Sequence, residues 1–463
     1  MAGLPAVTPS IAARLDRLPP SRYLQGLVAR ISIGGFFELY DLFMTGYIAV
    51  GLIQAGIFKA STTELLDING YASFVGAGFA GMFLGTLLFS WFSDRFGRRA
   101  TFTFSLLWYS AATLVMAFMS SPAALDLWRF ICGLGIGVQL VTISSYITEI
   151  TPKGSRGRYI ALSQFISFCS VPVVAALSLL AIPHKILHLD GWRYVAMVGS
   201  GGTLFAWFLR ARLPESPRWL EAHGHKESAE KTISEMEHRI ASEFGGQLPP
   251  PESAVNETGP QRGAWTEIWR SPYLGRTLML TIFNAFQAIG FYGFAAWVPI
   301  LLVNEGIAVT KSLTYVLVIA LLNPFGSLWA MRYADVLQRK WQIVVLALVI
   351  ALCGLLWAQQ RAALGIILFG SLITLANSWF SCILHTYQAE LYPTRIRAQA
   401  VGFVYSWSRF TLIFAGFLIA RALHAYGTTG VFVIVATAML VVAGVVAILG
   451  PNSNRIRLEV LSR

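Results

Sequence analysis

Long apolar segments alternate with short polar ones along most of this chain. A helix needs about 20 predominantly apolar residues to cross a hydrocarbon core about 30 Å thick, and we count twelve segments that meet this requirement. Six are centred near residues 40, 81, 110, 137, 170 and 201, and six near residues 289, 322, 349, 376, 411 and 439. The pattern predicts an all-α membrane protein with two bundles of six transmembrane helices.

Polar stretches divide the chain into five predicted regions. These are an amino-terminal segment at 1–25, a first bundle at 26–211, a central loop at 212–274, a second bundle at 275–450 and a tail at 451–463. The central loop contains a charged stretch at 226–239 and then three consecutive prolines at 249–251. Such a composition is typical of a linker with short helices, so we expect this loop to join the two bundles.

The composition agrees with a membrane protein, since 56% of the 463 residues are hydrophobic and only 13% are charged, against roughly 25% charged in soluble domains. A formal net charge of +12 raises the question of nucleic-acid binding. The basic residues, however, gather at the ends of predicted helices and not along one soluble face. We therefore expect contact with a lipid bilayer and no nucleic-acid partner.

Basic residues are concentrated in every second loop. The rich loops contain Arg95, Arg98 and Arg99; Lys153, Arg156 and Arg158; Arg332, Arg339 and Lys340; and Arg395 and Arg397. The positive-inside rule then places both termini and the central loop in the cytoplasm. The first 22 residues are charged and lack a continuous apolar core, so we expect no cleavable signal peptide. This predicts a multi-pass protein of a bacterial-type inner (plasma) membrane.

Two polar motifs recur in the second half of the chain at the same offset of 241 residues. Asp94 with Arg98 and Arg99 returns as Asp335 with Arg339 and Lys340. The motif Tyr146-x-x-Glu149-x-x-Pro152-x-x-x-Arg156 returns as Tyr387-x-x-Glu390-x-x-Pro393-x-x-x-Arg397. Equal offsets at two motifs with the same internal spacing indicate a duplicated half, which is a known construction of membrane transporters.

These motifs resemble those of the major facilitator superfamily over essentially the whole chain. The run Asp94–Arg99 is similar to the most diagnostic loop motif of that superfamily, and Pro214–Trp219 resembles the sugar-porter branch and its relatives. Glu38 and Asp41, three positions apart, resemble the paired acids of the proton-coupled metabolite and aromatic acid symporters. The resemblance implies twelve helices in two six-helix bundles related by pseudo-two-fold symmetry, and secondary transport by alternating access.

By this resemblance, the duplicated charges form a cytoplasmic gate. Its members are Asp94, Arg98, Glu149 and Arg156 in the first half and Asp335, Arg339, Glu390 and Arg397 in the second. Exposed ion pairs are individually weak, so pairs of this kind can break and re-form as a carrier opens and closes. The alternative is that these residues only orient the chain through positive charge, but that would not require acids at fixed spacing.

Three ionisable residues are predicted near the middle of helices, where charge is costly and functional by default. Glu38 and Asp41 lie one turn apart on the first helix, and Arg409 lies about halfway along the eleventh. A buried carboxyl can take up a proton on one side and release it on the other, and a guanidinium can hold a carboxylate by two hydrogen bonds. We expect Glu38 or Asp41 to carry a proton and Arg409 to bind an anionic substrate; the alternative for Arg409 is permanent neutralisation of an acid.

Polar and aromatic residues at similar depth are further candidates for substrate binding. The superfamily resemblance places the first, fourth, seventh and tenth helices along the transport path. The candidates are Gln139, Asn284, Gln287, Asn323 and Asn377 among the amides, and Tyr40, Tyr292 and Trp379 among the aromatic residues. Each of them can also serve only in packing or in hydrogen bonds between helices. His385 lies nearer the cytoplasmic end, where we favour a structural histidine over a proton relay.

Cofactor and metal chemistry are not indicated. Four cysteines stand singly in apolar segments, a pattern that favours neither a metal site nor a disulfide framework. No phosphate-binding loop is visible, so we expect no ATP-driven transport, and no convergent nucleophile and base indicate an enzyme.

The sequence therefore predicts a monomeric secondary transporter that moves a small organic anion together with protons. A sugar or polyol carrier is the second interpretation, because the loop motifs are shared with that branch, although a neutral polyol does not require Arg409 and Glu38. A membrane sensor that has lost transport is a third.

Overall fold

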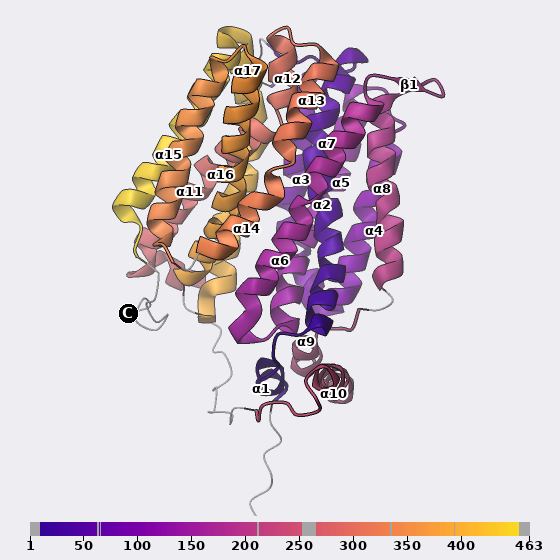
Figure 1. Cartoon of the computed structure of the whole chain (residues 1–463), viewed down its shortest axis with the longest axis vertical. Helices are drawn as coiled ribbons and strands as arrows, with labels where there is room; N and C mark the ends of the chain where they lie inside the picture. The colour runs from indigo at the N-terminus through magenta and orange to yellow at the C-terminus, as the bar shows by residue number, and fades with distance from the viewer. Residues whose placement is uncertain are drawn as a thin grey trace, which may run out of the picture.

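The computed structural model describes residues 10–62, 64, 66–210, 213–251, 265–333, 336–392 and 394–452. Only the backbone is described at 89–91, 93–94, 140–141, 202–210, 331, 389, 394–395 and 397–398. Helices of the first half and helices of the second half form two groups that stand side by side (Figure 1).

The first half contains seven long helical pieces. They are α2 (Arg22–Gln54), α3 (Tyr71–Phe96), α4 (Arg98–Met116), α5 (Pro122–Ile150), α6 (Arg156–Phe168), α7 (Ser170–Ala181) and α8 (Gly191–Arg210). A short 3-10 turn, η1 (Lys153–Ser155), leads into α6. Between α7 and α8 the strands β1 (Lys185–Ile186) and β2 (Leu189–Asp190) form an antiparallel hairpin. This hairpin marks one end of the molecule, which we call the β1–β2 end (Figure 1).

The second half is helical in its described residues. Its elements are η2 (Trp265–Trp269), α11 (Tyr273–Ala295), α12 (Val298–Asn304), α13 (Val309–Ala320), α14 (Asn323–Tyr333), α15 (Arg339–Ala358), α16 (Ala363–Glu390) and α17 (Thr394–Leu449). Within α17 the backbone leaves helical geometry at Gly427, with φ 63° and ψ −160°. A positive φ favours glycine, and this break separates two spans that the sequence predicted as distinct helices.

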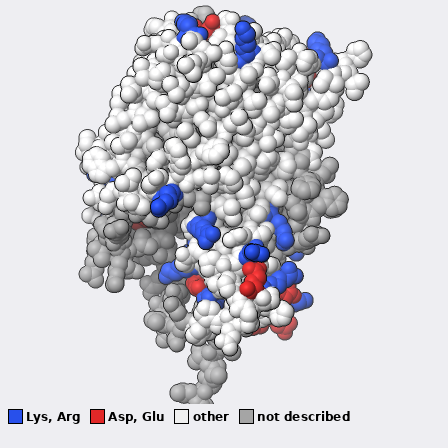
Figure 2. Space-filling model, viewed as in Figure 1, with Lys and Arg blue, Asp and Glu red and all other residues white. Residues whose placement is uncertain are grey.

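Nine helices in the described part of the chain are long and apolar enough to cross a membrane, one of them covering residues 399–449 on both sides of Gly427. The remaining predicted spans near residues 110 and 201 are the helices α4 and α8. On the face drawn in Figure 2, uncharged atoms form a broad belt, with charged residues gathered at its two borders. The twelve-helix fold predicted from the sequence agrees with this architecture.

Glycines allow α3 and α5 to pack with their backbones in direct contact. A Cβ atom at Gly81 would lie 2.1 Å from the carbonyl oxygen of Phe130, and one at Gly137 would lie 2.4 Å from that of Met82. No other residue fits such separations without moving a backbone, as is common where membrane helices approach closely.

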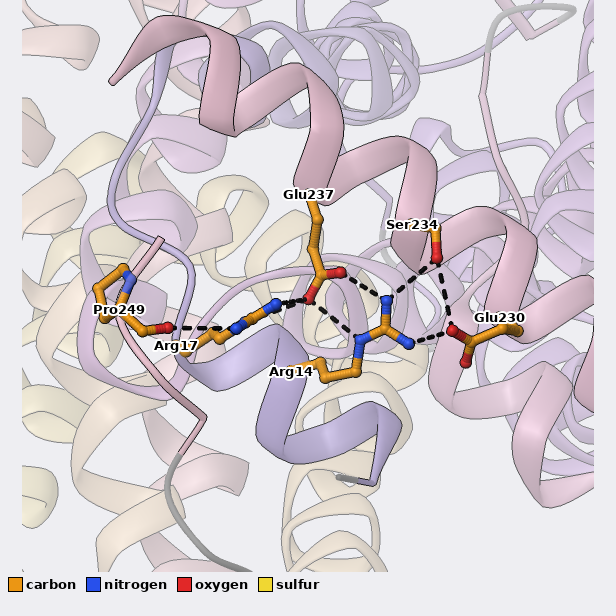
Figure 3. Close-up of polar contacts among 6 residues, drawn as sticks. All are labelled: Arg14, Arg17, Glu230, Ser234, Glu237 and Pro249. Atoms are coloured by element: carbon orange, nitrogen blue, oxygen red, sulfur yellow. Dashed lines mark hydrogen bonds and ion pairs between the residues drawn. The ribbon is translucent and has the colours of Figure 1, made fainter. Parts of the chain in front are cut away.

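Three further helices cover the opposite end of the first half: α1 (Ile11–Asp16), α9 (Pro217–Ala222) and α10 (Lys226–Glu243). We call them the α1–α9–α10 layer. Arg14 of α1 and Arg17, directly after this helix, both bind Glu237 of α10, at 2.5 and 2.6 Å (Figure 3). Burial raises the pKa of Glu237, but the hydrogen bonds from these two arginines outweigh it and lower the pKa below its ordinary value. The layer is therefore held together by charge as well as by an apolar core.

Glu243 of this layer and Glu215, which precedes α9, bind the amino-terminal ends of two long helices. Glu243 accepts hydrogen bonds from the backbone amides of Arg22 and Tyr23 at the start of α2, both at 2.8 Å. Glu215 accepts a hydrogen bond from the backbone amide of Arg98 at the start of α4, at 3.0 Å. The first amides of a helix lack partners within it and attract negative charge, so the layer is attached firmly to the first half.

Candidate functional site

A buried ion pair lies inside the first half, between α2 and α5. Arg129 donates to Asp41 at 2.6 Å, and the two side chains are only 2% and 4% exposed. Thr113 of α4 donates to the other carboxylate oxygen of Asp41 at 3.1 Å, and a second guanidinium nitrogen of Arg129 donates to Thr45. The pair therefore has hydrogen-bonding partners on three helices, which buried charges require.

Arg129 is the residue that the sequence interpretation missed. Only Glu38, Asp41 and Arg409 were predicted as charges near mid-depth, whereas the structure adds a fourth. Arg129 lies two turns after Pro122 at the start of α5, so in the sequence it resembles an interfacial anchor. The sequence does contain a signal for this ion pair. Arg129 lies well inside an apolar segment, and another apolar segment contains an acid.

Glu38 and Arg409 are the other two intramembrane charges, and neither has an oppositely charged partner within 4 Å among the described residues. Glu38 is 5% exposed and Arg409 is 8% exposed. They are near enough to interact electrostatically although they belong to different halves of the chain. Both roles predicted for Arg409, binding of an anionic substrate and neutralisation of an acid, therefore stay predictions.

The guanidinium of Arg409 stacks on the ring of Tyr405, one turn earlier in α17, with its carbon 3.8 Å from the ring centre. It also donates to Ser408 at 3.1 Å. The hydroxyl of Tyr405 lies 3.3 Å from Nε2 of His385 on α16, and Nδ1 of His385 lies 2.7 Å from the carbonyl oxygen of Ser381. This chain of contacts links α16 to the buried cation on α17.

Tyr292 of α11 lies between the two halves. Its ring packs edge-on against Phe79 of α3 at 5.1 Å, and it interacts electrostatically with both Glu38 and Arg409. Tyr292 is thus a predicted aromatic residue that the structure brings near both Glu38 and Arg409.

The predicted amides fall into two groups. Asn284 is fully buried and exchanges hydrogen bonds with Gln388 of α16, at 3.3 and 3.5 Å. Gln139 is also fully buried, but neither of its amide atoms has a partner in the part of the chain that the structure describes. Gln287 is 7% exposed and likewise makes no hydrogen bond within the described ranges. Asn284 thus ties α11 to α16, and the roles of Gln139 and Gln287 in substrate binding stay predictions.

A cavity lies between the two halves on the β1–β2 side of the charges. The space that it encloses is about 30 Å³, and the figure rises to about 410 Å³ only when space open to solvent is included. Its polar wall is formed by Asn323, Thr374 and Asn377, and its apolar wall by Phe43, Tyr47, Phe291, Phe294, Ala295, Val298, Val316, Ile319 and Ala320. Asn323 accepts a hydrogen bond from Ser378 at 3.1 Å, which leaves Asn377 as the freer amide.

Two of the predicted aromatic residues, Tyr40 and Trp379, use their polar atoms in hydrogen bonds within their own half, and a role of their rings in substrate binding stays a prediction. The hydroxyl of Tyr40 donates to the carbonyl oxygen of Val195 in α8 at 2.8 Å, and its ring packs against Gly199. The indole nitrogen of Trp379 donates to Gln342 in α15 at 3.1 Å. Both side chains fasten a helix to a neighbour in its own half.

The duplicated motifs form equivalent ion pairs in the two halves. Arg98 binds Glu149 at 2.8 Å, and Arg339 binds Glu390 at 2.9 Å. Arg156 begins α6. Asp335 and the side chains of Asp94 and Arg397 lie outside the described residues, so the complete gate stays a prediction.

At the β1–β2 end the two halves touch. Tyr71 of α3 and Trp297, just before α12, pack edge-on with ring centres 5.3 Å apart. A Cβ atom at Gly46 of α2 would lie 2.8 Å from the Cα atom of Ala296.

Among the described residues no cluster of three His, Cys, Asp or Glu side chains is arranged for a metal ion.

A model of the sugar (and other) transporter family matches residues 27–463. The chain therefore belongs to this family of the major facilitator superfamily, and is a multi-pass secondary transporter for a small molecule.

Individual relatives cover nearly the whole chain. The putative metabolite transport protein YyaJ of Bacillus subtilis (strain 168) is 32% identical over 443 residues, which is 96% of each chain. The niacin transporter NiaP of Acinetobacter baylyi is 27% identical over 452 residues, which is 97% of this chain and 99% of the relative. The partially occluded inward open structure of the xylose transporter XylE from E. coli superposes with a TM-score of 0.74 at 19% identity, over 94% of this chain and 99% of that one. The last comparison establishes the fold alone.

Proposed function

We propose that this transporter is a proton-coupled symporter of a small organic anion of the carboxylate or aromatic acid type. The observation that carries the proposal is the buried cation of Arg409, which has no carboxylate partner among the described residues. A buried charge without a partner is costly, and a carboxylate on the substrate supplies the missing one. The name of the relative NiaP supports this class, because niacin is a pyridine carboxylic acid.

Proton coupling rests on the two acids of α2. Ionised Asp41 binds Arg129, and a proton on Asp41 would weaken that ion pair. Glu38 has no such partner within the described ranges. Burying its charged form therefore costs more free energy than burying its neutral form when no cation approaches. Arrival of a substrate anion at Arg409 changes the charge that Glu38 faces across the two halves. Protonation and anion binding are thereby linked.

The orientation follows from the same proposal. The α1–α9–α10 layer and the ion pairs Arg98–Glu149 and Arg339–Glu390 lie at the end that the positive-inside rule assigns to the cytoplasm. Contact between the halves at the β1–β2 end then corresponds to a carrier closed toward the outside. We place the protein in a bacterial-type inner membrane, as a monomer whose two bundles, 26–211 and 275–450, rock about the central site.

Uptake into reconstituted vesicles tests the proposal. Radiolabelled nicotinate, benzoate, acetate, xylose and glucose are supplied with and without an inwardly directed pH gradient. We expect accumulation of at least one carboxylate, increased by the gradient and abolished by a protonophore. Accumulation of a sugar with no response to any carboxylate would overturn the proposal.

A sugar or polyol carrier is the second candidate, favoured by one feature. The cavity on the β1–β2 side has only amide and hydroxyl groups, from Asn323, Thr374 and Asn377, on its polar wall. Groups of that kind suit a neutral polyol. Asn377→Leu distinguishes the candidates, because it should impair sugar uptake strongly if the cavity holds a sugar.

A further inference from the structure

The residues around Arg409 fix the orientation of its guanidinium as well as burying its positive charge. Its guanidinium lies over the ring of Tyr405, at 3.8 Å from the ring centre. Stacking on an aromatic face uses the flat side of the guanidinium and leaves the N–H groups at its edge free. Ser408 takes a single hydrogen bond from Nη1, so much of this edge is available to a ligand.

Tyr405 is itself fixed by His385. Nδ1 of His385 lies 2.7 Å from the carbonyl oxygen of Ser381, which can only accept, so Nδ1 carries the hydrogen. In the neutral imidazole Nε2 is then an acceptor, and the Tyr405 hydroxyl, 3.3 Å away, donates to it. The two rings also meet edge-on, with centres 5.3 Å apart.

Four residues thus form a continuous arm from α16 to α17: Ser381 binds His385, His385 binds Tyr405, and Tyr405 supports Arg409. The arm spans two helices of the same half, so it turns with that half as one unit. A guanidinium fixed in one plane favours a carboxylate that lies in that plane and accepts two parallel hydrogen bonds.

We propose that Tyr405 and His385 are positioning residues that fix the guanidinium plane of Arg409 and thereby select substrates with a planar carboxylate over their neutral amides. This inference rests on the proposed transport of an organic anion and deepens it. Neither residue needs to touch the substrate, because both act through the orientation of Arg409.

The test compares each acid with its amide in the vesicle assay: nicotinate with nicotinamide, benzoate with benzamide, and acetate with acetamide. Tyr405→Leu removes the supporting ring. For the acid that the wild type takes up, we expect KM to rise about tenfold with the maximal rate little changed, and the preference for acid over amide to fall in proportion.

Two smaller changes separate positioning from packing. Tyr405→Phe keeps the ring and removes only the bond to His385, so we expect KM to rise about threefold. His385→Leu should reproduce that rise, and His385→Gln, which retains an acceptor, should restore much of the wild-type KM. These variants carry the test should Tyr405→Leu fail to fold. Tyr426→Leu, at a 77% exposed position of α17, is the matched control and should behave as the wild type.

The two levels of inference fail in different ways. If the wild type takes up none of the three acids, the proposed function itself is wrong. If the wild type takes up an acid but folded Tyr405 and His385 variants retain its KM and the acid-over-amide preference, the positioning role alone is overturned.

Discussion

The two halves of this transporter hold their intramembrane charges in different ways. In the first half, Asp41 and Arg129 neutralise one another at 2.6 Å and are enclosed by hydrogen bonds from neighbouring helices. In the second half, Arg409 is also buried but lies on an aromatic ring, and no acid is within 4 Å of it among the described residues. Glu38 faces it from the first half without direct contact.

The Asp41–Arg129 pair stabilises the first bundle, whereas the charge of Arg409 is available to bind a substrate anion. Breaking a buried pair by removing one member costs about 3–5 kcal/mol, because the other charge remains buried alone. Removing Arg409, which has no anion beside it among the described residues, leaves no unpaired buried charge behind. Substitutions at the Asp41–Arg129 pair should therefore lower stability more than substitutions at Arg409. Substitutions at Arg409 should instead act mainly on substrate binding.

The largest expected effect on stability is at the paired site. Arg129→Leu leaves Asp41 ionised without a partner, and we expect a loss of about 3–5 kcal/mol, visible as a much lower thermal unfolding temperature in detergent. Arg129→Leu combined with Asp41→Asn should recover part of the loss. Equal unfolding temperatures for the single variant and the wild type would show that the pair does not hold the bundle.

The next effect concerns substrate binding at the unpaired site. Arg409→Gln should raise KM for the transported carboxylate about a hundredfold, which corresponds to about 2.7 kcal/mol, with little change in unfolding temperature. Arg409→Lys keeps the charge but loses the planar fork, so its KM should lie between those of Arg409→Gln and the wild type. A large loss of stability in Arg409→Gln would instead indicate a structural cation.

Glu38 tests the link between the two sites. Replacement by glutamine should abolish accumulation driven by a pH gradient while sparing exchange of substrate across the membrane. With one proton per substrate, a gradient of one pH unit supports about tenfold accumulation, and this ratio should fall to one in Glu38→Gln. Asp41→Asn is the parallel variant; normal accumulation in both would exclude a proton role for either acid.

The smallest effect is expected at the surface, in the α1–α9–α10 layer. The pKa of Glu237 is lowered below its ordinary value of 4.5, so its contribution to stability is present above that value and is lost as the pH falls through the lowered one. Glu237→Gln should remove a contribution of about 1 kcal/mol or less. Hydrogen exchange of residues 11–16 at pH 7 and pH 4 measures it, with the more exposed Glu230→Gln as control. A wild type with equal protection at both pH values would contradict this prediction.

Much of the fold could be predicted from the sequence, because it depends on properties that single segments carry. Segment length and apolarity predict the spans, and the paired motifs predict Arg98–Glu149 and Arg339–Glu390, since a repeated local motif packs in a repeated way. The site was less predictable. Tyr40 and Trp379 sit at suitable depths, but depth does not reveal the direction in which a side chain points on a helix that is apolar on every face.

The sequence by itself determined the class of protein, the two halves and the presence of the acids Glu38 and Asp41 beside a distant Arg409. Only the tertiary structure decided which charges meet. Asp41 pairs with Arg129, a residue 88 positions away. Arg409 instead contacts Tyr405, which binds His385. The reason is physical: hydrophobicity is a property of each segment, whereas the pairing of buried charges depends on which helix faces are turned toward one another.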